Sequence, residues 1–102
     1  MRVFFIGTVE FSLRALEKLI TLNNVEVVGV AIKTDTAGNA DFADLLPICK
    51  DHNIPVKVVN DINHPNNVSF IRATRPDVIY YLGWSNLIKK ELLSVTRLGV
   101  VG

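Results

Sequence analysis

Short apolar runs alternate with longer amphipathic segments along the whole chain. Five runs consist mainly of apolar residues, many of them β-branched or aromatic: 3–6, 25–32, 54–59, 77–82 and 98–101. Such runs are typical of strands in a sheet that is covered on both faces. Because proline donates no backbone hydrogen bond, Pro55 fits best at the first residue of its strand or in a strand at the sheet edge.

The segment after the first run has the spacing of a helix. Leu13, Leu16 and Ile20 recur at intervals of three and four residues, which predicts an amphipathic helix over about 10–22. Thr8 precedes this segment, and its hydroxyl is suited to cap the helix by accepting a hydrogen bond from a backbone N–H of the first turn.

Three further helices are predicted in the remaining intervals. The second helix begins at Asp41 or Asp44. Pro47 is tolerated only in the first turn of a helix, and Asp44 as the cap would place it there. A polar turn is predicted at 60–67, and two weaker helices follow it at 68–73 and 87–93.

Strands that alternate with helices predict an α/β fold: a Rossmann-like, mostly parallel five-stranded sheet with helices on both faces. The 102 residues fit one domain (1–102) and contain no linker or internal repeat. An uncovered last strand would be prone to pair with other strands. We therefore expect this domain to be part of a longer protein, and its exposed last strand to favour self-association.

Charge and composition exclude several classes of protein. The chain has 11 Lys and Arg against 10 Asp and Glu, a net charge of +1, which excludes binding to DNA or an anionic membrane by bulk charge. No apolar run approaches the ~20 residues that a transmembrane helix needs. The single cysteine, Cys49, can form no internal disulfide, so we expect a protein of a reducing, cytoplasmic compartment.

The predicted topology places a ligand crevice beyond the carboxyl ends of the first and fourth strands, where the strand order reverses. Two predicted loops lie there, Gly7-Thr8-Val9 and Gly83-Trp84-Ser85-Asn86. The next glycine after Gly7 is Gly29, and no Gly-Lys-Ser/Thr loop exists, which disfavours NAD, FAD and ATP as ligands. Trp84 either fills the end of the sheet or forms a wall for a flat ligand.

The ionisable residues show no spacing for catalysis or metal binding. His52 and His64 have no partners at ligand spacing and are expected at the surface. Cys49 shares a helix face with Leu45, as a small core residue does. The residues alone therefore indicate a ligand-binding α/β unit without a catalytic centre or a metal site, and a non-catalytic nucleotide- or metabolite-binding module is an alternative.

Several segments resemble formyltransferases. Gly7-Thr8-Val9-Glu10-Phe11 resembles the Gly-Thr-Pro-Glu-Phe opening of methionyl-tRNA formyltransferases, with Val9 in place of the usual proline, and 52–56 resembles their junction between helix and third strand. Segments 76–79, 83–88 and 98–101 are similar to the folate side that this family shares with glycinamide ribonucleotide and sugar-nucleotide N-formyltransferases. The resemblance implies that the chain is the N-terminal part of a formyltransferase domain.

This resemblance implies transfer of a formyl group from the co-substrate 10-formyltetrahydrofolate to an amine, without a metal. The pterin ring would lie beside the loop after the fourth strand, at Tyr81, Gly83, Trp84, Ser85, Asn86, Leu87 and Ile88. Apolar support would come from Tyr81, Leu92 and Val100, while Gly7, Thr8 and Val9 would face the amine. The acceptor would be a sugar-nucleotide or other small amine, which the charge balance favours, or an aminoacyl-tRNA.

The catalytic residues of the family lie outside the matching segments. Its Asn, His and Asp are located at and beyond the fifth strand, and Gly102 occupies the place of the Asn. Formyl transfer needs acid–base help and stabilisation of an oxyanion. The full-length parent would be an enzyme, and we expect this chain alone to be inactive.

Overall fold

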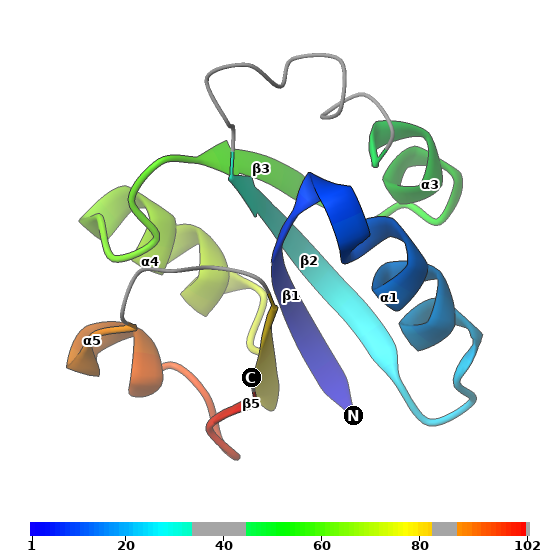
Figure 1. Ribbon diagram of the computed structural model, residues 1–102. Helices are drawn as coiled ribbons and strands as arrows, with labels where there is room; N and C mark the ends of the chain where they lie inside the picture. Colours follow the sequence, from blue (N-terminus) through cyan, green and yellow to red (C-terminus); the bar gives the residue numbers. More distant parts are fainter. Residues whose placement is uncertain (34–44, 83–87, 102) are drawn as a thin grey trace.

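A computed structural model describes residues 1–33, 45–82 and 88–101; for 8–12, 33 and 82 it describes the backbone only. Strands and helices alternate through these residues (Figure 1). Their bounds are β1 Arg2–Thr8, α1 Val9–Thr21, β2 Glu26–Lys33, α3 Leu46–Asp51, β3 Val56–Val59, α4 Pro65–Ala73, β4 Val78–Leu82, α5 Lys90–Leu93 and β5 Val100–Val101. No described helix is both long enough and apolar enough to cross a membrane.

The five strands form one parallel sheet in the order β3-β2-β1-β4-β5. The chain builds outward from β1 to β3, and α4 then carries it back across the sheet to β4 on the other side of β1. Figure 1 shows α1 and α3 on one face of the sheet and α4 and α5 on the other. The predicted α/β class, the central first strand and the two helical layers are confirmed, and Pro55 directly precedes the edge strand β3, as expected.

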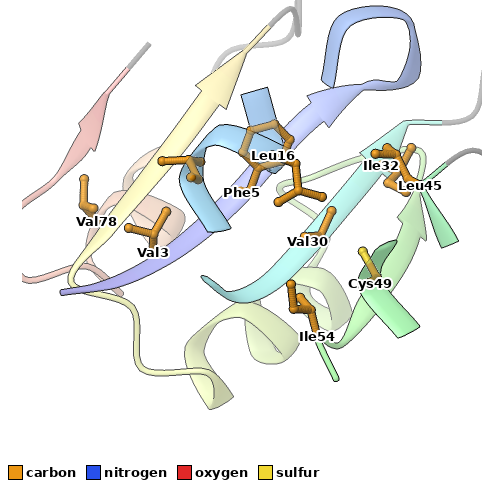
Figure 2. Packing of buried hydrophobic residues seen from close by; sticks show 10 residues of the cluster. Val3, Phe5, Leu16, Val30, Ile32, Leu45, Cys49, Ile54 and Val78 are labelled. Atoms are coloured by element: carbon orange, nitrogen blue, oxygen red, sulfur yellow. The ribbon is translucent and has the colours of Figure 1, made fainter. Parts of the chain in front are cut away.

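The first of two core clusters fills the α1 and α3 face (Figure 2). Phe5 and Val30 project from the central strands, and Leu16 of α1 and Cys49 of α3 cover them, all four being almost fully buried. Leu13 and Ile20 pack at the margin of this cluster, which confirms the predicted apolar face of the first helix. Cys49 is a core residue, and burial raises the pKa of its thiol, so it stays protonated and unreactive.

The second cluster fills the α4 and α5 face. Phe4 and Ile79 project into it from the sheet, Ile71 comes from α4, and Leu92 comes from α5. Successive residues of a strand point to opposite faces. Phe4 and Phe5 therefore serve different clusters, which explains why the strand sequences are continuously apolar.

The first strand is longer than predicted, and no loop separates it from α1. β1 continues through Gly7 and Thr8, and α1 begins at Val9. The expectation of a loop at 7–9 is therefore wrong. Gly7 pairs on both sides, with Ile32 of β2 and Leu82 of β4, and pairing on two sides outweighs the weak strand preference of a single glycine.

Two helices begin later than predicted. The residue that precedes α3 is Leu45, not Asp41 or Asp44, and it makes no side-chain capping bond. Leu45 is fully buried in the first cluster, so packing rather than a polar cap fixes this helix start. Pro47 does lie in the first turn. α5 begins at Lys90 instead of residue 87, after an extended Lys89.

Conversely, α4 begins at Pro65, within the segment predicted to be a polar turn. His64 caps it: its Nδ1 accepts the backbone N–H of Asn66 at 3.1 Å. Pro65 has the fixed backbone angle that suits a first helical position. Asn67 is buried, and its side-chain amide donates to the Asp61 carbonyl at 2.6 Å. The polar residues that suggest a turn therefore form the hydrogen bonds that stabilise the start of this helix.

Asp77 ties three strand starts together at the amino edge of the sheet. Its Oδ2 accepts the Arg2 backbone N–H at 2.8 Å, and its Oδ1 accepts the Arg97 Nε at 3.1 Å. Its backbone N–H donates to the Arg2 carbonyl, and its carbonyl accepts the Leu98 N–H, which leads into β5. The hydrogen bonds from Arg2 and Arg97 lower the pKa of this carboxyl group.

We expect a pH-dependent contribution of Asp77 to stability. Because its pKa is lower in the folded state, the carboxylate stabilises the fold fully above the unfolded pKa of about 3.9 and loses this effect as pH falls through the folded pKa. The difference in unfolding free energy between wild type and Asp77→Asn should therefore be largest near neutral pH and shrink in acid. Denaturant titrations at several pH values would measure it. Glu26→Gln removes only an exposed contact to Arg2 at 3.7 Å, and an equal response of that control would contradict the assignment.

Candidate functional site

The predicted ligand crevice corresponds to the carboxyl ends of β1 and β4. Gly7 of β1 lies opposite Leu82 of β4, so the two strand ends are adjacent. The strand order reverses at this point, because β2 and β3 lie on one side of β1, whereas β4 and β5 lie on the other side. This junction is the place where open parallel sheets bind ligands. Thr8 ends β1 and Val9 begins α1 at this rim.

Most of the predicted folate-side residues lie outside the described residues. These are Gly83, Trp84, Ser85, Asn86 and Leu87, and their assignment stays a prediction. Tyr81 and Ile88 flank that segment and are both partly buried. Of the predicted folate-side residues, Tyr81 and Ile88 are therefore the two whose positions the structure gives.

Tyr81 and Ile88 belong to the same apolar cluster. Both pack on the second core cluster, as does Val100 of β5, and Leu92 is a fully buried member of that cluster. The structure thus brings together in one cluster the three residues predicted as apolar support for the pterin, Tyr81, Leu92 and Val100. Burial raises the pKa of the Tyr81 phenol, which keeps it uncharged. Tyr80 packs instead on the opposite face.

A groove of about 390 Å³ lies between the start of α4 and the start of α5. Its lining residues are Asn63, Pro65, Val68, Ser69, Arg72, Lys89 and Glu91. Arg72 and Lys89 contribute two positive charges to this groove, and Glu91 contributes one negative charge. One lining residue of the groove, Lys89, directly follows the predicted folate segment, which ends at Ile88.

A tertiary hydrogen bond fixes the two sides of the groove relative to each other. The Asn63 Oδ1 accepts the backbone N–H of Lys89 at 2.8 Å, which joins the residues before α4 to those before α5. Pro65, Ser69 and Arg72 follow one another at the spacing of one helix face. This groove was not predicted from the sequence, because 60–67 has the composition of a turn and because no sequence pattern reveals the contact between Asn63 and Lys89.

The described residues provide binding groups without an acid–base pair at the rim. Within ranges 1–33, 45–82 and 88–101, no three His, Cys, Asp or Glu residues lie close enough to hold a metal ion. His52 terminates α3 and His64 caps α4, and both are exposed. Cys49 is buried on the opposite face of the sheet.

The comparisons with known proteins point to one group of enzymes. The methionyl-tRNA formyltransferase of Thermotoga maritima is 34% identical over 97% of this chain, and that of Geotalea daltonii is 31% identical over 99%. The chain is similar to the N-terminal third of methionyl-tRNA formyltransferases. It covers 33% of the length of each of these two relatives. No protein-family model matches the chain.

The predicted resemblance to formyltransferases is therefore confirmed. It extends over nearly the whole chain, including a second Thermotoga methionyl-tRNA formyltransferase at 32% identity. The α/β fold with the strand order 3-2-1-4-5 accompanies this sequence similarity. The chain thus combines similarity to a third of these enzymes with a Rossmann-like parallel sheet of its own.

Proposed function

We propose that this chain is the folate-binding part of a formyltransferase that transfers the formyl group of 10-formyltetrahydrofolate to an amine. The observation that carries the proposal is the identity of about one third to methionyl-tRNA formyltransferases over 97% of the chain. The rim of β1 and β4 supports it, because this rim combines adjacent strand ends with an uncharged apolar cluster.

The chemistry of a reduced folate matches these features. Its pterin is a flat, polar ring, which in this proposal is held by main-chain groups of 83–88 beside Tyr81. Its glutamate tail carries carboxylates, and the groove beyond Ile88 presents Lys89 and Arg72 to them. Charge-assisted hydrogen bonds of this kind are stronger than neutral ones. The amine would approach Gly7, Thr8 and Val9 at the junction of β1 and α1.

Binding and reaction are separate in this proposal. Formyl transfer requires proton transfer and stabilisation of a developing oxyanion, and the described residues at the rim supply no group for either task. The chain alone would bind the folate without transferring the formyl group. The names of the relatives favour a methionyl-tRNA acceptor for a whole enzyme, whereas the net charge of +1 gives this chain no strong attraction for RNA.

Titration with 5-formyltetrahydrofolate, followed by Trp84 fluorescence and calorimetry, tests the folate site. We expect saturable binding that Arg72→Ala weakens by about threefold to tenfold, since an exposed ion pair contributes up to about 1 kcal/mol. Arg14→Ala, an exposed arginine of α1 on the opposite face, is the matched control and should leave binding unchanged. An analogue without the glutamate should bind more weakly to the wild type and equally to wild type and Arg72→Ala.

Two results would contradict the proposal. One is a flat titration at millimolar ligand with an intact circular dichroism spectrum. The other is saturable binding of ATP or NAD, measured by equilibrium dialysis, in the absence of folate binding. The second result would instead support the non-catalytic nucleotide-binding module, the alternative that the missing glycine fingerprint disfavours.

A further inference from the structure

The segment between β3 and α4 is held in place by its own hydrogen bonds. The Asn63 backbone N–H donates to the Asp61 Oδ1 at 3.0 Å, and the His64 N–H donates to the Asp61 carbonyl at 3.1 Å. The side-chain amide of the buried Asn67, in α4, donates to the same carbonyl at 2.6 Å. An aspartate that accepts the N–H two residues later forms an Asx-turn. These bonds fix the backbone of Asn63 relative to α4.

The Asn63 side chain makes a contact outside this segment, with the residue that precedes α5. Its Oδ1 accepts the Lys89 N–H at 2.8 Å. The Lys89 carbonyl in turn accepts the N–H groups of Leu92 and Leu93, both at 3.1 Å. The backbone of Lys89 is therefore held at its donor by the segment before α4 and at its acceptor by α5.

This hydrogen bond sets the relative position of two positive charges. Arg72 of α4 and Lys89 both line the groove between α4 and α5. A helix as short as α5 needs tertiary contacts to persist. Leu92 supplies the apolar contact, whereas Asn63 ties the residue before α5 to the element that carries Arg72. Cations that are already in position bind an anionic ligand with a smaller loss of conformational freedom than mobile ones.

We propose that Asn63 is a positioning residue for this groove, which holds the Lys89 ammonium on the α5 side so that it and Arg72 bind the carboxylates of the glutamate tail together. The inference rests on the proposed folate site. Asn63 acts through Lys89, because its Oδ1 is engaged by the Lys89 N–H. A structural role in the fold as a whole would weaken every ligand alike. A positioning role affects only ligands that carry the tail.

Calorimetric titrations with 5-formyltetrahydrofolate, and with the analogue that lacks the glutamate, test this role. We expect Asn63→Ala to weaken binding of 5-formyltetrahydrofolate by about threefold to fivefold, the size of effect that one exposed ion pair has. Binding of the analogue should not change. Asn66→Ala is the matched control, because Asn66 is an exposed asparagine in the first turn of α4, outside the groove lining. This variant should leave both affinities unchanged.

A double-mutant cycle tests whether Asn63 acts through Lys89. Lys89→Ala removes the ammonium and keeps the backbone N–H that Asn63 accepts. In that background Asn63→Ala should weaken binding no further, so the two effects should not add. Amide hydrogen exchange gives a second readout without any ligand. The Lys89 N–H should be protected in the wild type and in Asn66→Ala, and should exchange faster in Asn63→Ala.

The outcomes separate this inference from the folate site itself. If the wild type does not bind 5-formyltetrahydrofolate, both are wrong. If the wild type binds it and Asn63→Ala binds it equally well, only the positioning role is wrong. Equal weakening of the analogue, full additivity with Lys89→Ala, or free exchange of the Lys89 N–H in the folded wild type would also overturn this role alone. An Asn63→Ala chain that circular dichroism shows to be unfolded would assign Asn63 to the fold instead.

Discussion

Leu92→Ala should lower the free energy of unfolding by about 2–5 kcal/mol, the range found for truncation of buried leucines. Leu92 is fully buried and is the buried residue of α5. A helix of four residues cannot persist without tertiary packing, so this one side chain holds α5 against the sheet. For a domain of this size the loss is a large part of the total stability, which is typically about 5–15 kcal/mol. Urea unfolding followed by circular dichroism would measure it.

The neighbouring leucine is a matched control for this effect. Leu93 belongs to the same helix, but its side chain is 45% exposed. Leu93→Ala should change the unfolding free energy by less than about 0.5 kcal/mol, as exposed substitutions usually do. Equal losses for the two variants would show that α5 is not anchored through Leu92, and the position assigned to the groove beside α5 would then be in doubt.

Gly29→Ala should destabilise the fold by about 1–3 kcal/mol, the usual cost of an overpacked core. A Cβ atom at Gly29 would lie 2.6 Å from Cε2 and 2.9 Å from Cδ2 of Phe4, and 3.2 Å from Cγ2 of Thr74. The Phe4 ring cannot swing away freely, because it is fully buried and packs edge-to-face on Phe70 with centroids 5.9 Å apart. Thermal and denaturant unfolding would both show the loss.

A double-mutant cycle distinguishes this steric clash from an unfavourable effect of alanine on the strand backbone itself. Phe4→Leu shortens the side chain that a Cβ at Gly29 would meet. In the Phe4→Leu background the cost of Gly29→Ala should therefore fall, with a coupling energy of about 0.5–3 kcal/mol. Strict additivity of the two substitutions would contradict the steric explanation and would point to backbone conformation instead.

The sequence reveals the strands more reliably than the helix starts. Consecutive apolar residues such as Phe4 and Phe5 predict a strand that is covered on both faces. Because parallel strands are connected by helices, these helices provide the cover. Helix starts depend on choices between local polar contacts and packing. Leu45 begins α3 through burial, and His64 begins α4 through an imidazole cap. A histidine before a proline is a weak signal, and it becomes clear only with the bond to Asn66 in view.

The candidate site was predictable in location but not in detail. Strand order alone places the crevice at the ends of β1 and β4, and the structure brings those ends together. The packing of Tyr81 with Leu92 and Val100 follows from strand alternation and is consistent with the family resemblance. The groove beside α4 depends on the contact between Asn63 and Lys89, which are 26 positions apart. The close approach at Gly29 was not predicted either, because the ring beside it belongs to Phe4 of β1, a different strand.

The central position of β1 has a consequence for the order of folding. Within this chain β1 precedes both of its neighbours, and one of them, β4, begins only at Val78. In a nascent chain that contains only β1, β2 and β3, the backbone groups on one side of β1 therefore have no partner strand. Pairing this side with β4 requires contacts between residues far apart in sequence, which makes folding slow. Until β4 has been added, the open side of β1 can therefore pair with strands of other chains.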